Sequence, residues 1–283
     1  MKKLNKQIDQ FIVAGLEEDI QTGDHTSLAC IPPQSQSKAK LLVKEDGIIA
    51  GVAIAKKIFK KVDPKAKVKV LIKDGSPVKY GDIVFTVSCN SQALLKAERL
   101  LLNTMQRMSG IATQSRKYAD EVADLPVKVL DTRKTTPLIR FLEKWAVKIG
   151  GCTNYRTGLY DRFMIKDNHV DACGSIEEAI LKINAYNKKH KLHLKSTVEV
   201  RNIKELKKVL KVGHVNRIML DNFKLADMRK AVKIIDGKYE VEASGGVTMK
   251  TLRKIAKTGV DFISVGALTH SAKSMDMSLK VVK

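Results

Sequence analysis

The amino-acid sequence predicts an α/β protein in two parts, a small mixed α/β domain followed by a series of βα units with parallel strands. The first observation is a group of three β-like stretches around one helical segment in the first third of the chain. The second is a series of six short apolar runs after residue 126, each followed by a helical pattern of about ten or more residues. Six such units are enough for either a β/α barrel or an open sheet.

The first part of the chain has the patterns of a small mixed domain. Apolar residues at helical spacing predict a helix over residues 5–20, which Gly23 and Asp24 end. One helical segment and three β-like stretches follow, the helix at residues 51–62 and the strands at 40–43, 68–72 and 83–87. A long helical pattern over residues 91–124, with few breakers except Gly110, then predicts a connector into the second part.

The second part alternates apolar runs with helical patterns, and polar or glycine-rich residues follow each run. The runs lie at residues 127–130, 163–165, 197–200, 217–220, 239–243 and 262–265. The groups at their ends are Asp131-Thr-Arg-Lys134, Lys166-Asp-Asn-His169, Glu199, Asp221-Asn222, Ser244-Gly-Gly246 and Gly266-Ala-Leu-Thr-His270. The carboxyl ends of parallel barrel strands meet at one face, where enzymes of this kind have their active sites. Polar loops alone explain one or two such ends, but six ends with apolar strands between them favour an enzyme.

Four cations among these residues are suited to binding anions. They are Arg133, Lys134, Arg156 and Lys166. An Arg guanidinium binds a carboxylate or phosphate through two parallel hydrogen bonds, whereas a Lys ammonium acts as a point charge. The sequence therefore predicts a strongly anionic substrate.

Two carboxylates, Glu199 and Asp221, fall among these cations. Such a pair is expected where magnesium pyrophosphate is held, or where a positively charged transition state needs a negative neighbour. Either carboxylate could instead simply pair with a barrel lysine, and the pattern does not decide between these roles.

Two glycine-rich turns predict a site for a terminal phosphate. Ser244, Gly245 and Gly246 follow the fifth run, and Gly266 follows the sixth. Exposed backbone N–H groups beside the start of a helix are how a barrel binds phosphate. His270 could donate to the same phosphate or cap the helix that follows.

Composition makes several other classes of protein less favoured. The net charge of +22 raises nucleic acid as a partner, but the lysines are spread over every segment without an aromatic-laced basic cluster, so no nucleic acid is expected. No run reaches the roughly 18 apolar residues of a membrane helix, and the apolar run at residues 11–16 is too short for a signal peptide, so we expect no membrane association and a cytoplasmic location. The spacing of the four cysteines supports neither a zinc site nor disulfides, so we expect reduced cysteines that are mostly buried.

Several motifs in one order resemble a known family. They are Glu98-Arg99, Asn103-Thr-Met-Gln-Arg-Met-Ser-Gly-Ile-Ala-Thr113, Asp131-Thr-Arg-Lys-Thr-Thr-Pro137, Gly150-Gly-Cys-Thr-Asn-Tyr-Arg-Thr-Gly-Leu-Tyr-Asp161, Ile165-Lys-Asp-Asn-His169, Val198-Glu-Val200, Leu220-Asp-Asn-Phe223, Glu242-Ala-Ser-Gly-Gly246 and Ser264-Val-Gly-Ala-Leu-Thr-His-Ser271. Together they resemble quinolinate phosphoribosyltransferase, also called nicotinate-nucleotide pyrophosphorylase (carboxylating), over essentially the whole chain.

The resemblance implies a fold and an assembly. It implies an N-terminal α/β sandwich domain over residues 1–109, joined by the C-terminal segment 272–283, and an incomplete, about six-stranded β/α barrel over residues 110–271. It also implies a homodimer in which Arg107 enters the active site of the partner, and it leaves open whether dimers assemble further. Without the resemblance, Arg107 reads as a charge on a helix surface.

The resemblance further implies phosphoribosyl transfer from phosphoribosyl pyrophosphate to quinolinate with decarboxylation, in NAD biosynthesis. Its catalytic residues would be Lys134, Lys166, Glu199 and Asp221, the last two also holding Mg²⁺ mainly through pyrophosphate. Its substrate-binding residues would be Arg107, Thr132, Arg133, Tyr155, Arg156, Ser244, Gly245, Gly246, Gly266 and His270.

One residue departs from the pattern of the family, which usually has His where this chain has Tyr155. Tyr offers a neutral phenol on a longer side chain, so the acid pocket could be reshaped. Two alternatives therefore stay open. One is a related phosphoribosyltransferase for another heteroaromatic acid, such as the type associated with molybdenum transport. The other is a catalytically idle barrel that binds anions or nucleic acid.

Overall fold

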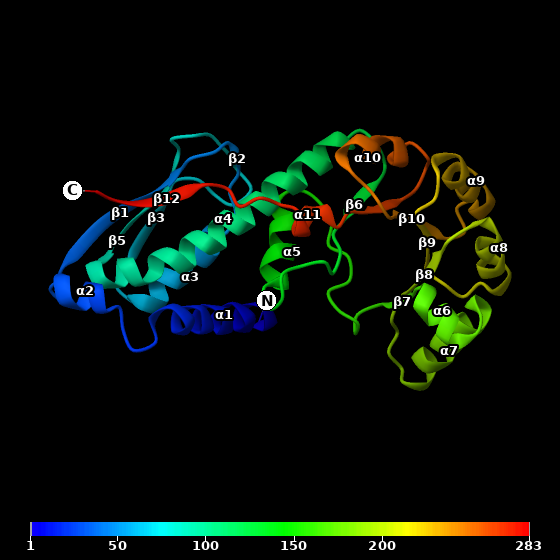
Figure 1. Ribbon diagram of the computed structural model, residues 1–283, viewed down its shortest axis with the longest axis horizontal. Coiled ribbons are helices and arrows are strands. Elements are labelled where there is room, and N and C mark those ends of the chain that lie inside the picture. Colours follow the sequence, from blue (N-terminus) through cyan, green and yellow to red (C-terminus); the bar gives the residue numbers. More distant parts are fainter. Residues whose placement is uncertain (1, 283) are drawn as a thin grey trace. The chain divides into compact units, whose positions relative to one another are not determined.

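The structure is a computed structural model that describes residues 2–282 (Figure 1). By its internal contacts the chain divides into two compact units. Unit 1 comprises Met1–Arg116, Thr135–Gly151 and Ser271–Lys283, and unit 2 comprises Lys117–Lys134 and Cys152–His270. The domain ranges expected from the sequence stay a prediction. Within the described residues, no helix is both long and apolar enough to cross a membrane.

Unit 1 contains most of the antiparallel strands and the longest helices. Its elements are α1 (Lys2–Ile20), α2 (His25–Cys30), β1 (Gln36–Val43), β2 (Gly47–Ile48), α3 (Val52–Val62), β3 (Lys67–Val70), β4 (Pro77–Val78), β5 (Ile83–Asn90), most of α4 (Ser91–Glu121), α5 (Arg140–Ile149) and β12 (Met277–Val282). The sequence predicted all but the short elements α2, β2 and β4 and the strand β12. The long helix ends at Glu121, three residues earlier than its pattern suggested.

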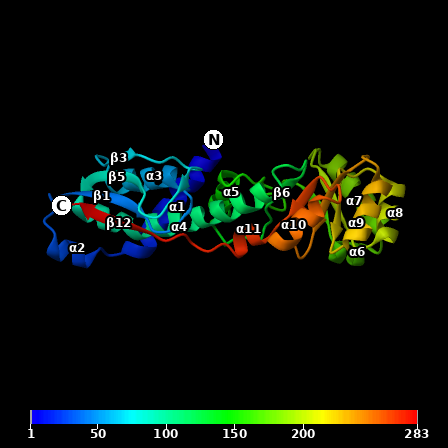
Figure 2. The same ribbon diagram turned by 90° about the horizontal axis from the view of Figure 1, so that it is seen from above.

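A four-stranded antiparallel sheet in the order β12-β1-β5-β3 forms the framework of unit 1. The helix α3 covers one face of this sheet and presents a buried apolar stripe to it (Figure 2). Phe59 of α3 packs edge to face against Phe85 of β5, with ring centroids 6.0 Å apart. The C-terminal strand β12 pairs with β1 so that Leu279 lies opposite Leu41, and both leucines are buried.

Gly110 allows helix α4 to approach the C-terminal segment closely. A Cβ added at this position would overlap the carbonyl oxygen of Lys273, and Ser274 Cα lies 3.2 Å from the same point. We expect Gly110→Ala to lower the free energy of unfolding by about 3 kcal/mol, because two pieces of backbone must separate and neither can change rotamer to relieve the overlap. Urea unfolding followed by circular dichroism measures this. The matched control is Lys117→Ala on the exposed side of the same helix, and an equal stability for both variants would contradict the close approach.

Unit 2 contains the repeated βα pattern. Its elements are β6 (Lys128–Leu130), β7 (Phe163–Ile165), α6 (Asp167–Cys173), α7 (Ile176–Lys189), β8 (Ser196–Val200), α8 (Ile203–Val212), β9 (Arg217–Asp221), α9 (Leu225–Ile235), β10 (Glu240–Ser244), α10 (Met249–Ala256), β11 (Phe262–Ser264) and α11 (Ala267–His270). All six strands lie within two residues of the apolar runs that predicted them. The helices α7, α8 and α9 lie along the outer side of the strands (Figures 1 and 2).

The six strands form one parallel sheet in the order β6-β11-β10-β9-β8-β7. This is the cyclic strand order of a β/α barrel with one seam left open, because β6 and β7 are the two edges and do not pair with each other. An isolated bridge between Leu130 and Thr153 extends the β6 edge. The fold class predicted from the sequence, an incomplete six-stranded barrel, is therefore confirmed.

Three expectations about local structure are wrong. The last two helical patterns give helices of eight and four residues, shorter than expected, because polar turns end them early. The strands are not apolar throughout: Thr197, Arg217 and Glu242 are buried within them, since the inner face of the barrel is lined with polar side chains. The cysteines carry no disulfide, but only Cys89 and Cys152 are buried, whereas Cys30 is exposed and Cys173 is partly exposed.

Candidate active site

Polar side chains from neighbouring strands face the same side of the sheet in unit 2. Side chains alternate along a strand, so Thr197 and Glu199 of β8 share a face with each other and with the residue opposite Thr197 on β9, Arg217. Asp221, at the end of β9, lies opposite Ser244 at the end of β10. The carboxylates predicted as site residues therefore project to the inner face, near the carboxyl ends of the strands.

Lys166 and Glu199 form an ion pair at the end of β7 and β8. Lys166 Nζ donates to Glu199 Oε2 at 2.8 Å, with the Lys side chain 43% exposed and the Glu side chain 7% exposed. The backbone N–H of Lys166 donates to His169 Nδ1 at 3.0 Å, which holds the start of α6. Glu199 thus has the lysine partner that the sequence left open, and this lysine is itself one of the predicted site residues.

Lys134, Gly266 and His270 lie together beside the end of β11. The point where a Cβ would lie on Gly266 is 3.1 Å from Lys134 Cδ and 3.0 Å from the His270 ring. Thr269 Oγ1 donates to the Lys134 carbonyl oxygen at 2.7 Å, and the Lys134 N–H donates to Thr132 Oγ1 at 3.1 Å. The structure therefore brings the end of the first strand next to the end of the sixth, as the cyclic order requires.

The glycine turn after β10 packs closely against the turn after β9. Asn222 adopts a left-handed backbone, with φ 54°, and its N–H donates to the Ser244 carbonyl oxygen at 2.9 Å. Its side-chain Nδ2 donates to Asp221 Oδ2 at 2.7 Å. Gly245 and Gly246 also have positive φ, 92° and 59°, and a Cβ on Gly245 would overlap Asn222 Oδ1. Only glycine suits Gly245, whereas the position of an added Cβ on Gly246 has no atom within 4 Å.

A cationic cavity lies along the open edge of β7. Its volume is about 490 Å³. The positively charged residues lining it are Arg133, Arg156, Arg162, Lys166 and Lys182, and no carboxylate is among the described lining residues. Burial, followed by the nearby charge of Arg133, lowers the pKa of the Arg156 guanidinium. Cations that are desolvated beside one another in this way favour an anionic ligand between them.

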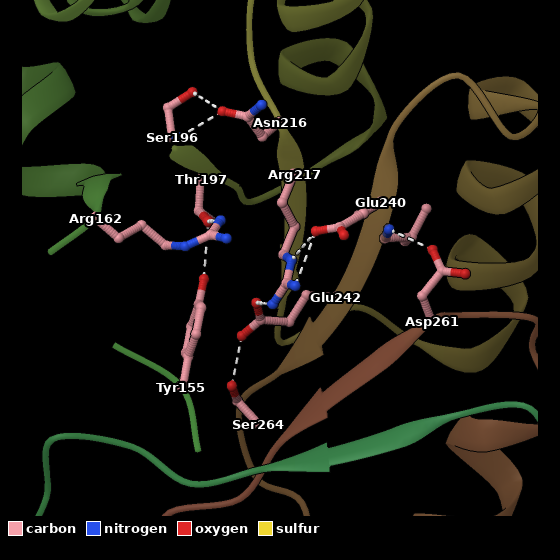
Figure 3. Close-up of polar contacts among 11 residues, drawn as sticks. Tyr155, Arg162, Ser196, Thr197, Asn216, Arg217, Glu240, Glu242, Asp261 and Ser264 are labelled. Carbon is pink, nitrogen blue, oxygen red and sulfur yellow. Dashed lines mark hydrogen bonds and ion pairs between the residues drawn. The ribbon is translucent and has the colours of Figure 1, made fainter. Parts of the chain in front are cut away.

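Tyr155 belongs to a partly buried polar network that also contains Arg162, Thr197 and Arg217 (Figure 3). Its hydroxyl lies 2.8 Å from Thr197 Oγ1, and the Arg217 guanidinium carbon lies 5.1 Å from its ring centroid. Burial, and then the charge of Glu242, raise the pKa of the Tyr155 hydroxyl, so the phenol stays protonated and neutral. Its backbone N–H donates to the buried Asp131 carboxylate at 2.8 Å.

Arg107 belongs to unit 1 and is not simply a charge on a helix surface. Its Nη2 pairs with Glu143 Oε1 at 2.8 Å, and its Nη1 donates to the Ala272 carbonyl oxygen at 2.8 Å. Glu143 is fully buried and also accepts from Thr136. A single chain does not test whether Arg107 enters the site of a partner, so that role stays a prediction.

A magnesium ion fits this site only together with substrate phosphates. No group of three or more His, Cys, Asp or Glu side chains is arranged around a metal position in the described residues. Glu199 and Asp221 nevertheless lie on adjacent strands and face the same side of the sheet. Magnesium commonly binds to one or two carboxylates plus phosphate oxygens and water, and the carboxylates of Glu199 and Asp221 are suited to this coordination.

Arg162 is a site residue that sequence reasoning missed. It lines the cationic cavity but lies just before β7, whereas the predicted site residues of the barrel strands follow the carboxyl ends of those strands. Its spacing from Lys166 could have revealed it. Residues 162, 164 and 166 alternate onto one face of an extended segment, so Arg162 and Lys166 project to the same side.

Matches to known protein families extend over most of the chain. The family described as "Quinolinate phosphoribosyl transferase, N-terminal domain" matches residues 24–109, and the corresponding "C-terminal domain" matches residues 111–280. A chloroplastic nicotinate-nucleotide pyrophosphorylase [carboxylating] from Arabidopsis thaliana is 46% identical over 285 residues, covering 95% of this chain and 81% of the relative. A probable nicotinate-nucleotide pyrophosphorylase [carboxylating] from Bacillus subtilis is 40% identical, covering 99% of this chain and 93% of the relative.

Solved structures agree with these relatives. NadC from Streptococcus pyogenes superimposes with a TM-score of 0.91 at 36% identity, covering 98% of each chain. Human nicotinic acid phosphoribosyltransferase reaches a TM-score of 0.67 at 11% identity, covering 92% of this chain and 72% of that one, which shows a shared fold alone.

Proposed function

The chain belongs to the quinolinate phosphoribosyltransferase family, and we propose that the six strand ends of unit 2 form the site at which it joins quinolinate to phosphoribosyl pyrophosphate. The reaction transfers the phosphoribosyl group to quinolinate with decarboxylation. It gives nicotinate mononucleotide, pyrophosphate and carbon dioxide in NAD biosynthesis. The observation that carries the site assignment is the cavity of about 490 Å³ lined by five cations and bordered by the Lys166–Glu199 pair.

The chemistry of the reaction asks for positioning and charge rather than for strong acid-base groups. The ring nitrogen of quinolinate attacks C1 of the ribosyl group while pyrophosphate leaves, so positive charge develops on the ribose. The bond between C2 and its carboxylate then breaks and releases carbon dioxide, the quaternised ring nitrogen stabilises the electron pair left on C2, and C2 takes up a proton from water to give nicotinate mononucleotide. Preorganised cations hold the two anionic substrates against each other, and carboxylates near the ribose stabilise the developing charge.

The predicted residues divide into three groups in this proposal. Arg133, Arg156 and Lys166 bind the carboxylates of quinolinate, and Tyr155 contacts Thr197 at 2.8 Å. Lys134, with Thr132 and His270 near it, and the turns at Ser244, Gly245, Gly246 and Gly266 bind the phosphates of phosphoribosyl pyrophosphate. Glu199 and Asp221 hold ribose hydroxyls and Mg²⁺, which supplies charge neutralisation of the leaving pyrophosphate when bound.

The proposal includes a homodimer in the cytoplasm, with Arg107 of each chain entering the site of the other. In the chain itself, Arg107 is held by Glu143 and by the Ala272 carbonyl oxygen, so its side chain is ordered by unit 1. Sedimentation velocity of the wild-type chain tests the dimer. Mixing Arg107→Ala chains with inactive Lys166→Ala chains tests the shared site, because hybrid dimers regain one complete site only if Arg107 acts across the interface.

A product assay tests the proposed function. Purified protein is incubated with quinolinate, phosphoribosyl pyrophosphate and Mg²⁺, and nicotinate mononucleotide is measured by mass spectrometry. Other pyridine and pyrimidine acids replace quinolinate in parallel reactions. Product from quinolinate is the expected result. A folded, dimeric protein that uses only another heteroaromatic acid would contradict the assignment of quinolinate while keeping the reaction class.

Gly245→Ala is expected to raise the KM for phosphoribosyl pyrophosphate about 10- to 100-fold, because a displaced phosphate-binding turn misplaces the reacting group. Gly245 has φ +92° and its added Cβ would overlap Asn222 Oδ1. The matched control is Gly237→Ala, at φ +68° with nothing within 4 Å of the added Cβ. Both variants strain a left-handed residue, but only the first should change this KM in steady-state kinetics. An equal effect of the two would contradict a phosphate role for the turn.

A further inference from the structure

Arg162 has a charge that the cavity does not neutralise. Two other cations of the cavity have carboxylate partners: Lys166 pairs with Glu199 at 2.8 Å, and Lys182 pairs with Glu178 at 2.8 Å. Arg162, by contrast, donates from Nη1 to a neutral hydroxyl, Thr197 Oγ1, at 3.0 Å. Among the described residues its guanidinium forms no ion pair. A partly buried guanidinium without a counter-charge on the wall of a cavity favours an anionic ligand.

The position of this guanidinium is fixed by two neutral side chains. Thr197 Oγ1 accepts from Arg162 and also lies 2.8 Å from the Tyr155 hydroxyl (Figure 3). The Arg162 guanidinium carbon lies 5.6 Å from the centroid of the Tyr155 ring, in the range of a cation–π contact. Tyr155 thus holds both the hydroxyl that Arg162 contacts and the guanidinium itself. The phenol and the threonine orient the cation without neutralising it.

The cations around the cavity are also electrostatically coupled. The charges of Arg133 and Arg162 both contribute to lowering the pKa of Arg156, after the larger effect of burial. The Arg156 side chain donates from Nη1 to the Arg162 carbonyl oxygen at 3.3 Å, so the two arginines are also linked through the backbone. The Asp161 carboxylate offsets part of this repulsion. An anion that enters the cavity relieves more of it, and a dianion relieves more than a monoanion.

We propose that Arg162, oriented by Thr197 and Tyr155, binds a carboxylate of the acid substrate and makes the site selective for a dicarboxylate over a monocarboxylate. The inference depends on the proposed function, because it assigns a further residue of the same acid site. Tyr155 in this account is a positioning residue, which acts through Arg162 rather than by charge. An uncharged phenol can perform this role, because orienting Arg162 requires a hydroxyl and a ring face but no charge.

The test compares Arg162→Met and Arg162→Lys with the wild-type chain in steady-state assays of nicotinate mononucleotide formation. Loss of one charge-assisted hydrogen bond should raise the KM for quinolinate about tenfold or more in Arg162→Met, with the KM for phosphoribosyl pyrophosphate changed less than about twofold. Arg162→Lys should recover part of this loss. Competitive inhibition by nicotinate, which has one carboxylate, should change much less, so the preference for the dicarboxylate falls.

Two further comparisons separate this role from a general effect on the fold. Thr197→Val removes the hydroxyl at constant volume and should raise the KM for quinolinate about three- to tenfold, whereas Thr197→Ser keeps the hydroxyl and should restore it. The matched control is Arg253→Met, an arginine that does not line the cavity, is 38% exposed and pairs with Asp124 at 2.7 Å, and it should leave this KM unchanged. Circular dichroism confirms folding of each variant.

The outcomes are distinguishable. No product from the wild-type chain would overturn the proposed function and this inference together. Product from the wild-type chain, with the KM for quinolinate in folded Arg162→Met equal to that of the wild-type chain, would overturn the inference alone. An equal rise in the KM for both substrates would also overturn it, because that result describes a general distortion of the site.

Discussion

Lys166→Ala and Lys134→Ala are each expected to lower kcat/KM at least about 100-fold, the scale of removing a preorganised electrostatic group from an active site. Lys166 is the stronger case because its ammonium bridges two functions. It lines the acid cavity and it donates to Glu199 Oε2 at 2.8 Å. Removing it takes away one cation that binds the substrate. It also leaves the Glu199 carboxylate, which is 7% exposed, without its partner. Steady-state kinetics with both substrates measures the loss.

A double variant separates these two effects of Lys166. Lys166→Ala with Glu199→Gln removes the charge on both partners. Compared with Lys166→Ala alone, the double variant should therefore regain part of the free energy of unfolding but none of the activity. Lys208→Ala is the control, because this lysine does not line the cavity, is 55% exposed and pairs with Glu177 at 3.5 Å. Near-normal turnover in both Lys134→Ala and Lys166→Ala would remove these lysines from the site.

The largest expected effect on stability is that of Arg217→Met, about 3–5 kcal/mol, the range for breaking a buried ion pair by removing one partner. The Arg217 side chain is 6% exposed, pairs with Glu242 at 3.1 Å and with Glu240 at 2.8 Å, and stacks 3.6 Å from the Phe262 ring centroid. Glu242 is fully buried and also accepts from Ser264. Without Arg217, the buried Glu242 carboxyl has hydrogen bonds from the Ser264 and Tyr155 hydroxyls but no cation to offset its negative charge. Urea unfolding of the full chain measures the change in midpoint.

The pH dependence of this variant gives a second check. Burial already raises the pKa of Glu242 above its ordinary value of 4.5, and loss of the Arg217 charge raises it further. A carboxyl with a raised pKa in the folded state destabilises that state as pH rises, and the penalty disappears below the unfolded pKa. The difference between Arg217→Met and wild type should therefore be largest near neutral pH and shrink toward pH 4.5.

Two variants serve as references for Arg217→Met. Arg217→Met combined with Glu242→Gln should recover much of the stability, because no buried charge remains. Arg253→Met removes an arginine whose partner, Asp124, is 60% exposed, and it should leave the midpoint nearly unchanged. A pH-independent loss, or an equal loss from Arg253→Met, would contradict the account of the buried network.

Most of the fold could be predicted from the sequence because each barrel strand is a short apolar run followed by a polar or glycine-rich turn. Elements whose sequences carry their own pattern were predicted, including the six barrel strands and the helix α3. The strand β12 was not predicted, and its pairing partner, β1, lies more than 230 residues away in the chain. The pair of two-residue strands β2 and β4 carries too few residues for any pattern.

The carboxyl ends of the strands also gave most of the candidate site, since the barrel rule places those ends together regardless of the sequences between them. What could not be predicted is the inner face of the barrel. Arg217 and Glu242 interrupt apolar runs. The pairing of β9 with β10 brings their side chains together as an ion pair, and the sequence alone does not show that pairing. Arg162 lies before its strand, so its place on the cavity wall depends on the open seam beside β7.

The measurement that tests the central claim most directly uses quinolinate with carbon-13 in the 2-carboxylate. The account predicts labelled carbon dioxide equimolar with nicotinate mononucleotide and pyrophosphate, and release only when phosphoribosyl pyrophosphate and Mg²⁺ are both present. Wild type should release the label and Lys166→Ala should not release it at a comparable rate. Labelled carbon dioxide released without phosphoribosyl pyrophosphate, or a nucleotide product that retains the label, would contradict phosphoribosyl transfer coupled to decarboxylation at this site.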